Sequence, residues 1–309
     1  MNRKLGAIAA IVLIIAFAAF IVYDITTGTL FTDREPVETT IAITYPEPAW
    51  QMSLFHEFPG AKLKAVAAAP GNRIAVGGEY FLSLLDSGLN VLWDTDTPES
   101  IEAIASHGNI IYAATENTIL LYTLGGELVT EWGPYEDNSL ITSLSANDNY
   151  VVVADAAFRR VWVLNHDGGV AAFFGHEGEK FIIPSPCFDI RILPDNSILV
   201  VNPGKQRIET RDLKGNVITH IGEPGMAPEA FSGCCNPSHF TILDGNHVVT
   251  AEKGAGRIKV MNLDGSLTEY VATPDDLTTT QPLDLAVCDD GRILAASAAE
   301  SKLYIFTRK

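Results

Sequence analysis

Short apolar runs separated by polar turns recur along the chain from about residue 61 to residue 309. Each run contains about five to eight residues rich in Val, Ile, Leu and Tyr, and Gly, Asn, Asp or Pro stands between neighbouring runs. Runs of this length, with no sustained apolar stripe at helical spacing, are typical of β-strands. The hydrophobic pattern therefore predicts an all-β domain.

The runs form a repeated block. A buried strand ends in a polar residue, a short loop with Gly or Arg follows, and a second strand leads to an Asp-Gly or Lys-Gly turn, most clearly in 151–169, 198–216 and 248–266. A repeat of about 40 to 50 residues in a β-protein is typical of one four-stranded propeller blade. The six equivalent strand ends are Gly78, Thr115, Asp155, Asn202, Glu252 and Ser297.

Six copies predict a six-bladed β-propeller, but the sixth copy ends one strand short. The segment AWQMSLFHEF (49–58) has the composition of a strand. We expect it to supply the missing outer strand, which closes the ring and removes exposed sheet edges. The predicted propeller spans 49–309, with blades at 61–98, 99–138, 139–184, 185–236, 237–280 and 281–309.

An apolar segment precedes the propeller. Residues 5–23 carry no charged side chain, and about twenty apolar residues are enough to cross a bilayer as a helix. Residues 1–23 are therefore predicted to be an uncleaved signal anchor with one transmembrane helix. A cleaved signal peptide is the alternative, but its apolar region would be shorter, and the small-residue pattern at 16–18 lies inside the run.

Charge predicts the orientation of this segment. Arg3 and Lys4 precede it and no basic residue directly follows it, so the positive-inside bias places the N-terminus in the cytoplasm. Residues 24–48 are expected to be a tether on the extracytoplasmic side, periplasmic or extracellular. The sequence thus predicts a single-pass cell-membrane protein that contacts the lipid bilayer through residues 5–23.

The net charge of the chain is -17, from 38 acidic and 21 basic residues. A surface this negative repels phosphate backbones, so nucleic acid is excluded as an expected partner.

Two long connections between blades are the expected carriers of function, because variable loops on a rigid scaffold usually hold the binding residues. They are 175–189, between blades three and four, and 222–240, between blades four and five. Both end where an innermost strand begins, so their side chains should gather at the channel mouth on one face. The residues concerned are Cys187, Asp189, Cys234, Cys235, Asn236 and His239.

These letters carry a family resemblance. The blade pattern resembles NHL-repeat propellers over nearly all of the chain after residue 60, and PSPCFDI, VVNPGKQRIET and GEPGMAPEAFSGCCNPSHF are similar to uncharacterised bacterial membrane-anchored NHL-repeat proteins with a Gly-Cys-Cys-Asn-Pro loop. The resemblance implies the propeller fold and no particular activity. Gly78, Thr115 and Ser297 depart from the Asp or Asn that is usual at this point of the repeat.

Three of the four cysteines lie in the two long connections. Cys234 and Cys235 are adjacent, so a vicinal disulfide, a pair with Cys187, inert thiols and a thiolate metal site are all open. We expect a structural disulfide, which is compatible with an extracytoplasmic location. Cys288 is expected to be a small buried hydrophobe.

Alignment of the six innermost strands reveals a row of residues that should share one level of the channel. The row reads Ala65, Ala103, Ser143, Asp189, His239 and Asp284. Convergence of Asp189, His239 and Asp284 would create a site for a divalent cation or for acid/base chemistry. The alternative is that these side chains bond neighbouring blades or channel water. We expect no cofactor, with a channel cation as the open alternative.

Two functions fit these features. The favoured one is a binding and scaffold module that docks on a membrane or extracytoplasmic protein, as an accessory subunit of a membrane complex, including a redox one. The other is a metal- or thiol-dependent enzyme, lyase- or lactonase-like, with Asp189, His239 and Asp284 at its centre and Cys187, Cys234 and Cys235 beside it. The chain contains no G-x-S-x-G, phosphate-loop or H-E-x-x-H motif, so hydrolase and nucleotide chemistry have no support.

Overall fold

A computed structural model describes residues 3–27, 45–176, 178 and 180–309. The chain divides into two compact units, 1–45 and 46–309, each of which is described by itself. Most of the tether predicted over 24–48, namely residues 28–44, lies outside the described residues.

The first unit contains one helix, α1 (Arg3–Thr27). The predicted apolar segment forms its central part, and the side chains described there are exposed. Judged on the residues that the structure describes, no helix has the combination of length and hydropathy that a membrane span requires. The structure therefore gives no support to the transmembrane helix predicted over residues 5–23.

The second unit is an all-β six-bladed propeller, as predicted, and each blade is a four-stranded antiparallel sheet. Blade one contains β2 (Leu63–Ala69), β3 (Arg73–Gly78), β4 (Phe81–Leu85) and β5 (Val91–Asp96). Blade two contains β6 (Ala103–His107), β7 (Ile110–Ala114), β8 (Ile119–Thr123) and β9 (Leu128–Trp132). Blade three contains β10 (Ile141–Ala146), β11 (Val151–Asp155), β12 (Arg160–Leu164) and β13 (Val170–Phe174).

The second half of the ring has the same organisation. Blade four contains β14 (Ile190–Ile192), β15 (Ile198–Asn202), the 3-10 turn η1 (Pro203–Lys205), β16 (Arg207–Arg211) and β17 (Val217–Ile221). Blade five contains β18 (His239–Asp244), β19 (His247–Glu252), β20 (Arg257–Asn262) and β21 (Leu267–Ala272). Blade six contains β22 (Leu283–Val287), β23 (Ile293–Ser297), β24 (Lys302–Arg308) and β1 (Trp50–Glu57).

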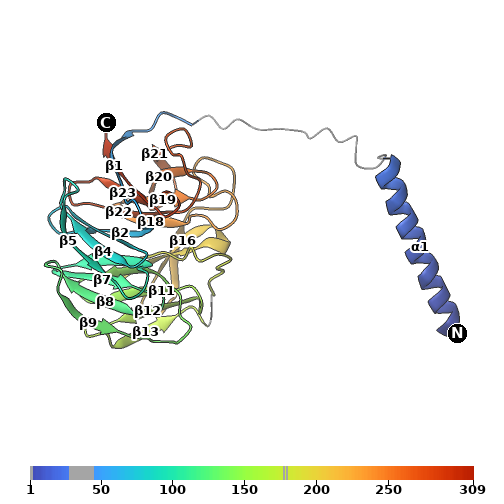
Figure 1. The fold of residues 1–309 in the computed structure, drawn as a ribbon, viewed down its shortest axis with the longest axis horizontal. Helices are drawn as coiled ribbons and strands as arrows, with labels where there is room; N and C mark the ends of the chain where they lie inside the picture. The colour runs from blue at the N-terminus through green and yellow to red at the C-terminus, as the bar shows by residue number, and fades with distance from the viewer. Residues whose placement is uncertain (1–2, 28–44, 177, 179) are drawn as a thin grey trace. The chain divides into compact units, whose positions relative to one another are not determined.

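The innermost strands β2, β6, β10, β14, β18 and β22 contact one another in a closed circle and surround a central channel. β1 pairs antiparallel with β24, so a strand from the start of the domain completes the last blade; in Figure 1 β1 lies beside the C-terminal strands. The Trp50 indole is buried and donates a hydrogen bond to Glu269 of blade five at 2.8 Å.

The burial pattern explains why the strands have these sequences. The second strand of a blade is covered on both faces by neighbouring blades, so β11 and β15 are buried at every position. The outer strands face solvent on one side, and β9 and β13 are largely exposed. Hydrophobic packing between blades therefore supplies the core, and the polar residue at the end of the second strand in blades two to six must find partners within it.

Candidate functional site

The predicted channel row lies at one register in the structure. Across each blade, its members stand opposite the residue that precedes the end position of the second strand, for example Ala65 opposite Gly77 and His239 opposite Ala251. His239 Nδ1 is 3.7 Å from Asp189 Oδ2 and 3.6 Å from Asp284 Oδ1. The structure thus brings together the three ionisable side chains that the sequence placed at one level.

Asp189 joins three blades. Its side chain is 1% exposed, and it accepts hydrogen bonds from the Phe240 amide of blade five at 2.8 Å and from the Ser143 hydroxyl of blade three. On its own blade it accepts a charge-assisted bond of 2.7 Å from Arg191 Nη1. These bonds satisfy a buried carboxylate that would otherwise destabilise the fold.

Asp284 has the corresponding role at the ring closure. Its Oδ2 accepts a hydrogen bond of 2.8 Å from the Val66 amide, which links blade six to blade one. The alternative interpretation, in which the row bonds neighbouring blades, therefore describes both carboxylates.

The electrostatics of the cluster follow from burial and proximity. Burial opposes ionisation of Asp189, but Arg191 and His239 outweigh it and hold its pKa well below the usual value. Burial alone would lower the pKa of His239, yet the adjacent Asp189 and Asp284 raise it. Burial raises the pKa of Asp284. The arrangement favours an imidazolium between two carboxyl groups.

The same three residues were the predicted cation site. Within the described residues, no group of three or more His, Cys, Asp or Glu side chains is arranged to hold a metal ion. His239 Nδ1 is buried and has no hydrogen-bond partner there, because both carboxylates lie beyond hydrogen-bond distance.

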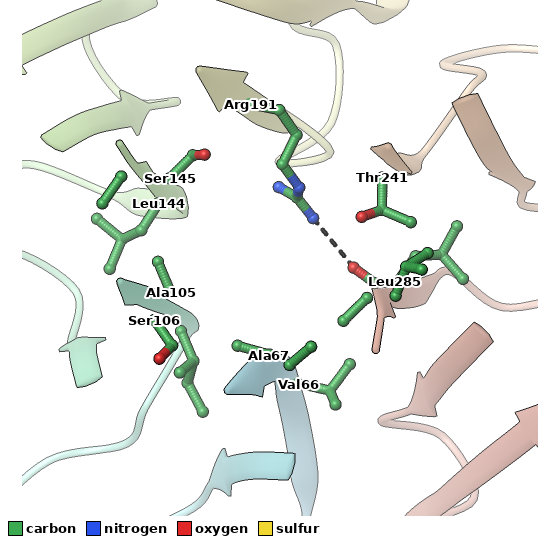
Figure 2. Close-up of a pocket in the computed structure, with 14 residues that line it drawn as sticks. Val66, Ala67, Ala105, Ser106, Leu144, Ser145, Arg191, Thr241 and Leu285 are labelled. Carbon is green, nitrogen blue, oxygen red and sulfur yellow. Dashed lines mark hydrogen bonds between the residues drawn. The ribbon is translucent and has the colours of Figure 1, made fainter. Parts of the chain in front are cut away.

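Arg191 is a channel residue that sequence reasoning missed. It follows Asp189 by two positions on β14, and its guanidinium crosses the channel to donate a 3.0 Å hydrogen bond to the Leu285 carbonyl of blade six (Figure 2). The signal was an arginine inside an innermost strand whose equivalents are apolar or small.

The cysteines correct one prediction. All four are free thiols, so the expected structural disulfide is absent. Cys234 is exposed whereas its neighbour Cys235 is buried, with a φ of 70°. Burial raises the pKa of the Cys187 thiol, and the Cys235 thiol raises that of Cys234. Since the thiolate is the reactive form, these thiols are poor nucleophiles at neutral pH. Cys288 is buried, and burial raises its pKa to about 11.

Asn236 closes the connection between blades four and five. Its side-chain amide donates to the Ser232 carbonyl at 2.7 Å and to the Lys253 carbonyl at 3.0 Å, and its oxygen accepts a hydrogen bond from the Lys253 amide. This predicted site residue is therefore a loop-fixing residue in the structure.

A buried ionic group on blade five also binds the connection between blades four and five. Glu252, at the end of β19, pairs with Arg257 and Lys259 of β20, each at 2.8 Å. Lys259 Nζ donates to the carbonyls of Pro228 and Ala230, at 3.2 and 3.0 Å, and Arg257 Nη2 also donates to Ala230. Burial lowers the pKa of Lys259 to about 8. The repeat pattern identified Glu252, but it did not predict that Arg257 and Lys259 donate hydrogen bonds to this connection.

Comparison with known proteins supports the fold. Neither a family model nor a curated protein sequence matches the chain. Streptogramin B lyase is similar in structure, with a TM-score of 0.56, 13% identity, and coverage of 83% of this chain and 98% of that one. The WD40 domain of Neurospora crassa Pan2 has a TM-score of 0.59 and 10% identity, with coverage of 85% of this chain and 97% of that one. The WD40 propeller domain of Doa1 has a TM-score of 0.57 and 11% identity, with coverage of 85% of this chain and 98% of that one. At these identities the likeness shows the propeller fold alone.

Proposed function

We propose that this protein is a protein-interaction module that docks through its connection face. This face carries the connections between blades and the loops between their second and third strands. Contacts between the two kinds of loop define it: Gln206, which follows η1, donates hydrogen bonds to the Phe231 carbonyl and to Gly233 in the long connection.

The proposal rests on the 222–238 connection, whose backbone is held by hydrogen bonds and which exposes an apolar side chain. Lys259, Arg257, Gln206 and Asn236 hold the backbone of the 222–238 connection. At the tip, the Met226 side chain is 71% exposed. Because the backbone of this loop is already ordered, binding through Met226 costs the rotamer entropy of its side chain but little backbone entropy.

The surroundings of Met226 indicate the partner's chemistry. Met226 lines a hollow of about 390 Å³ whose lining also contains three acidic residues, Glu223, Glu229 and Asp264. A partner that presents an apolar side chain flanked by basic residues would match this surface in shape and charge.

The membrane context completes the proposal. We infer that residues 5–23 anchor the chain, that residues 24–48 tether the propeller, and that the propeller lies on the extracytoplasmic side as an accessory subunit of a membrane complex, including a redox one. The apolar run, the preceding Arg3 and Lys4, and the NHL-type resemblance support this placement.

The enzyme alternative receives less support from the geometry. It requires acid/base work from Asp189, His239 and Asp284, but Asp189 is engaged by three blades and Asp284 by the Val66 amide. The arrangement therefore supports the binding module.

Site-specific photocrosslinking tests the docking face. A photoreactive amino acid replaces Met226 in the tagged full-length protein at native expression level, and the matched control replaces Ile218, an apolar side chain that is 62% exposed on β17. We expect one stoichiometric protein partner crosslinked from position 226 and not from 218, and loss of that partner in Met226→Asp.

Equal crosslinking from both positions, or an undiminished partner in Met226→Asp, would contradict docking through this loop. Recovery of that partner from the membrane fraction supports the accessory-subunit role, whereas a partner found only in soluble fractions contradicts it.

A further inference from the structure

The channel contains a cavity that the docking proposal does not use. It has a volume of about 150 Å³ and is lined by residues of the innermost strands (Figure 2). It follows the later parts of these strands, including Ala105 and Ser106 of β6 and Ser145 and Ala146 of β10. A volume of this size has room for a molecule as large as benzene, and most of the surface that lines the cavity is polar.

Arg191 is the one charged side chain among the residues that line this cavity. Asp189, His239 and Asp284 are not part of the lining. Arg191 Nη1 donates hydrogen bonds to Asp189, to the Ile190 carbonyl and to Ser143 Oγ, and Nη2 donates to the Leu285 carbonyl. No described residue accepts a hydrogen bond from its Nε, and one guanidinium carries five N–H donors. The charge of Arg191 is paired with Asp189, and its Nε–H and one Nη2–H remain as donors for a ligand.

One hydroxyl group adds a further donor. Thr241 is 6% exposed and lines the cavity, and its hydroxyl has no hydrogen-bond partner among the described residues. Figure 2 shows its side chain near the Arg191 guanidinium. Ser106 Oγ also has no partner among the described residues, but it has almost no accessible surface and cannot donate to a molecule in the cavity. Thr241 is not among the buried unsatisfied groups, so its hydroxyl can donate to a ligand or a water in the cavity.

Apolar side chains complete the wall. Val66, Ile104 and Leu144 belong to the lining on the opposite side of the ring from blade five. From this combination we propose that the channel binds a small organic carboxylate, whose carboxyl group accepts hydrogen bonds from Arg191 and Thr241 and whose short apolar part contacts these side chains. A planar guanidinium matches the geometry of a carboxylate, and inorganic phosphate, which has no apolar part, would gain nothing from Val66, Ile104 and Leu144.

Binding of fluoroacetate to the full-length protein, followed by ¹⁹F NMR line broadening, tests this site. Acetate, propionate and inorganic phosphate serve as competitors. We expect saturable binding that propionate displaces at lower concentration than acetate, because the added methylene contacts the apolar wall. Phosphate should compete least.

Two variants locate the site. Thr241→Val preserves the Arg191–Asp189 pair and removes only the hydroxyl, so it should weaken binding about tenfold. Arg191→Met should abolish binding; because it leaves Asp189 without its cation and is prone to unfold, Thr241→Val is the decisive variant. Thr219→Val, on the exposed side of β17, is the matched control and should bind as the wild type does.

Other results would overturn the proposal. Absence of saturable broadening would show that the cavity holds water alone. Equal affinity in wild type and Thr241→Val would place the anion elsewhere. Stronger competition by phosphate than by propionate would exclude a carboxylate with an apolar part.

Discussion

Blades one and five each have four strands in the same order, but the residue at the end of the second strand packs differently in the two blades. In blade one, β3 ends at Gly78, which lies so close to the Lys62 carbonyl that an added Cβ would be 1.8 Å from its oxygen. In blade five, β19 ends at Glu252, which holds two buried cations and through them the long connection. One position of the repeat thus permits either close backbone contact or a buried ionic group.

The difference extends around the ring. The channel row is Ala65 and Ala103 in the first two blades, whereas blades four to six carry Asp189, His239 and Asp284. Blades one and two therefore add no ionisable side chain to the row, although hydrogen bonds still join them to each other and to blade six, for example between Lys64 and Glu102 and between the Val66 amide and Asp284. All six blades thus share one scaffold, while the ionisable row residues and the two long connections all belong to blades three to six.

Removal of the blade-five carboxylate should have the largest effect. Glu252→Ala leaves Arg257 and Lys259 buried without their anion, and we expect it to lower the free energy of unfolding by about 3 to 5 kcal/mol. Glu79→Ala is the control, because its ion pair with Lys62 is about half exposed and should contribute little. Urea unfolding monitored by tryptophan fluorescence measures both; equal effects would remove the distinction between the blades.

Close packing in blade one should be nearly as sensitive. Gly78→Ala forces a side chain against the Lys62 backbone, and we expect a loss of about 1 to 3 kcal/mol. In blade five, Gly245 has no atom within 4 Å of an added Cβ, so Gly245→Ala should change stability little. Thermal unfolding compares the two variants, and a Gly78→Ala protein as stable as the wild type would refute the proposed role of close contact.

The channel cluster should give the smallest effect, visible as a dependence on pH. Because the pKa of His239 is raised above 6.5 in the fold, its contribution to stability is complete below pH 6.5 and is lost as pH rises through the folded value. The pKa of Asp284 is also raised, so its contribution to stability also falls as pH rises, beginning at lower pH. The charge on Arg191 opposes the increase in the pKa of His239. Burial lowers the pKa of Lys259 to about 8, so the pH range in which His239 can be observed separately ends below that value.

His239→Gln isolates this term. Denaturant midpoints measured from pH 5.5 to 7.5 should fall with rising pH in the wild type and fall less in the variant. Parallel curves for the two proteins would show that His239 does not exchange a proton in this range.

The fold was predictable because strand lengths and turn residues define the repeat, and both depend on local sequence. The convergence of Asp189, His239 and Asp284 followed from the same register, since equivalent positions of a closed ring share one level. Arg191 was not predictable as a channel-crossing residue, because the acceptor of its hydrogen bond is a backbone carbonyl two blades away.

The loop chemistry was also out of reach of the sequence. Adjacent cysteines suggested a disulfide, but the backbone conformation that leaves Cys234 exposed and Cys235 buried is set by contacts that the letters do not reveal. Lys259 and Arg257 interrupt an apolar strand, which signals buried charge, but the carbonyls they bind belong to a connection about 30 residues away in sequence.

The pairing of β1 with β24 has a consequence for biosynthesis. Ser53 and Ile305 meet across this pair although 252 residues separate them, so the ribosome releases β1 long before its partner exists. During that interval β1 is an unpaired edge that carries Met52, Leu54 and Phe55, side chains that stay exposed even in the finished ring. The edge of β1 stays open to aggregation until β24 is available to pair with it, and a chaperone that covers β1 would act in this interval.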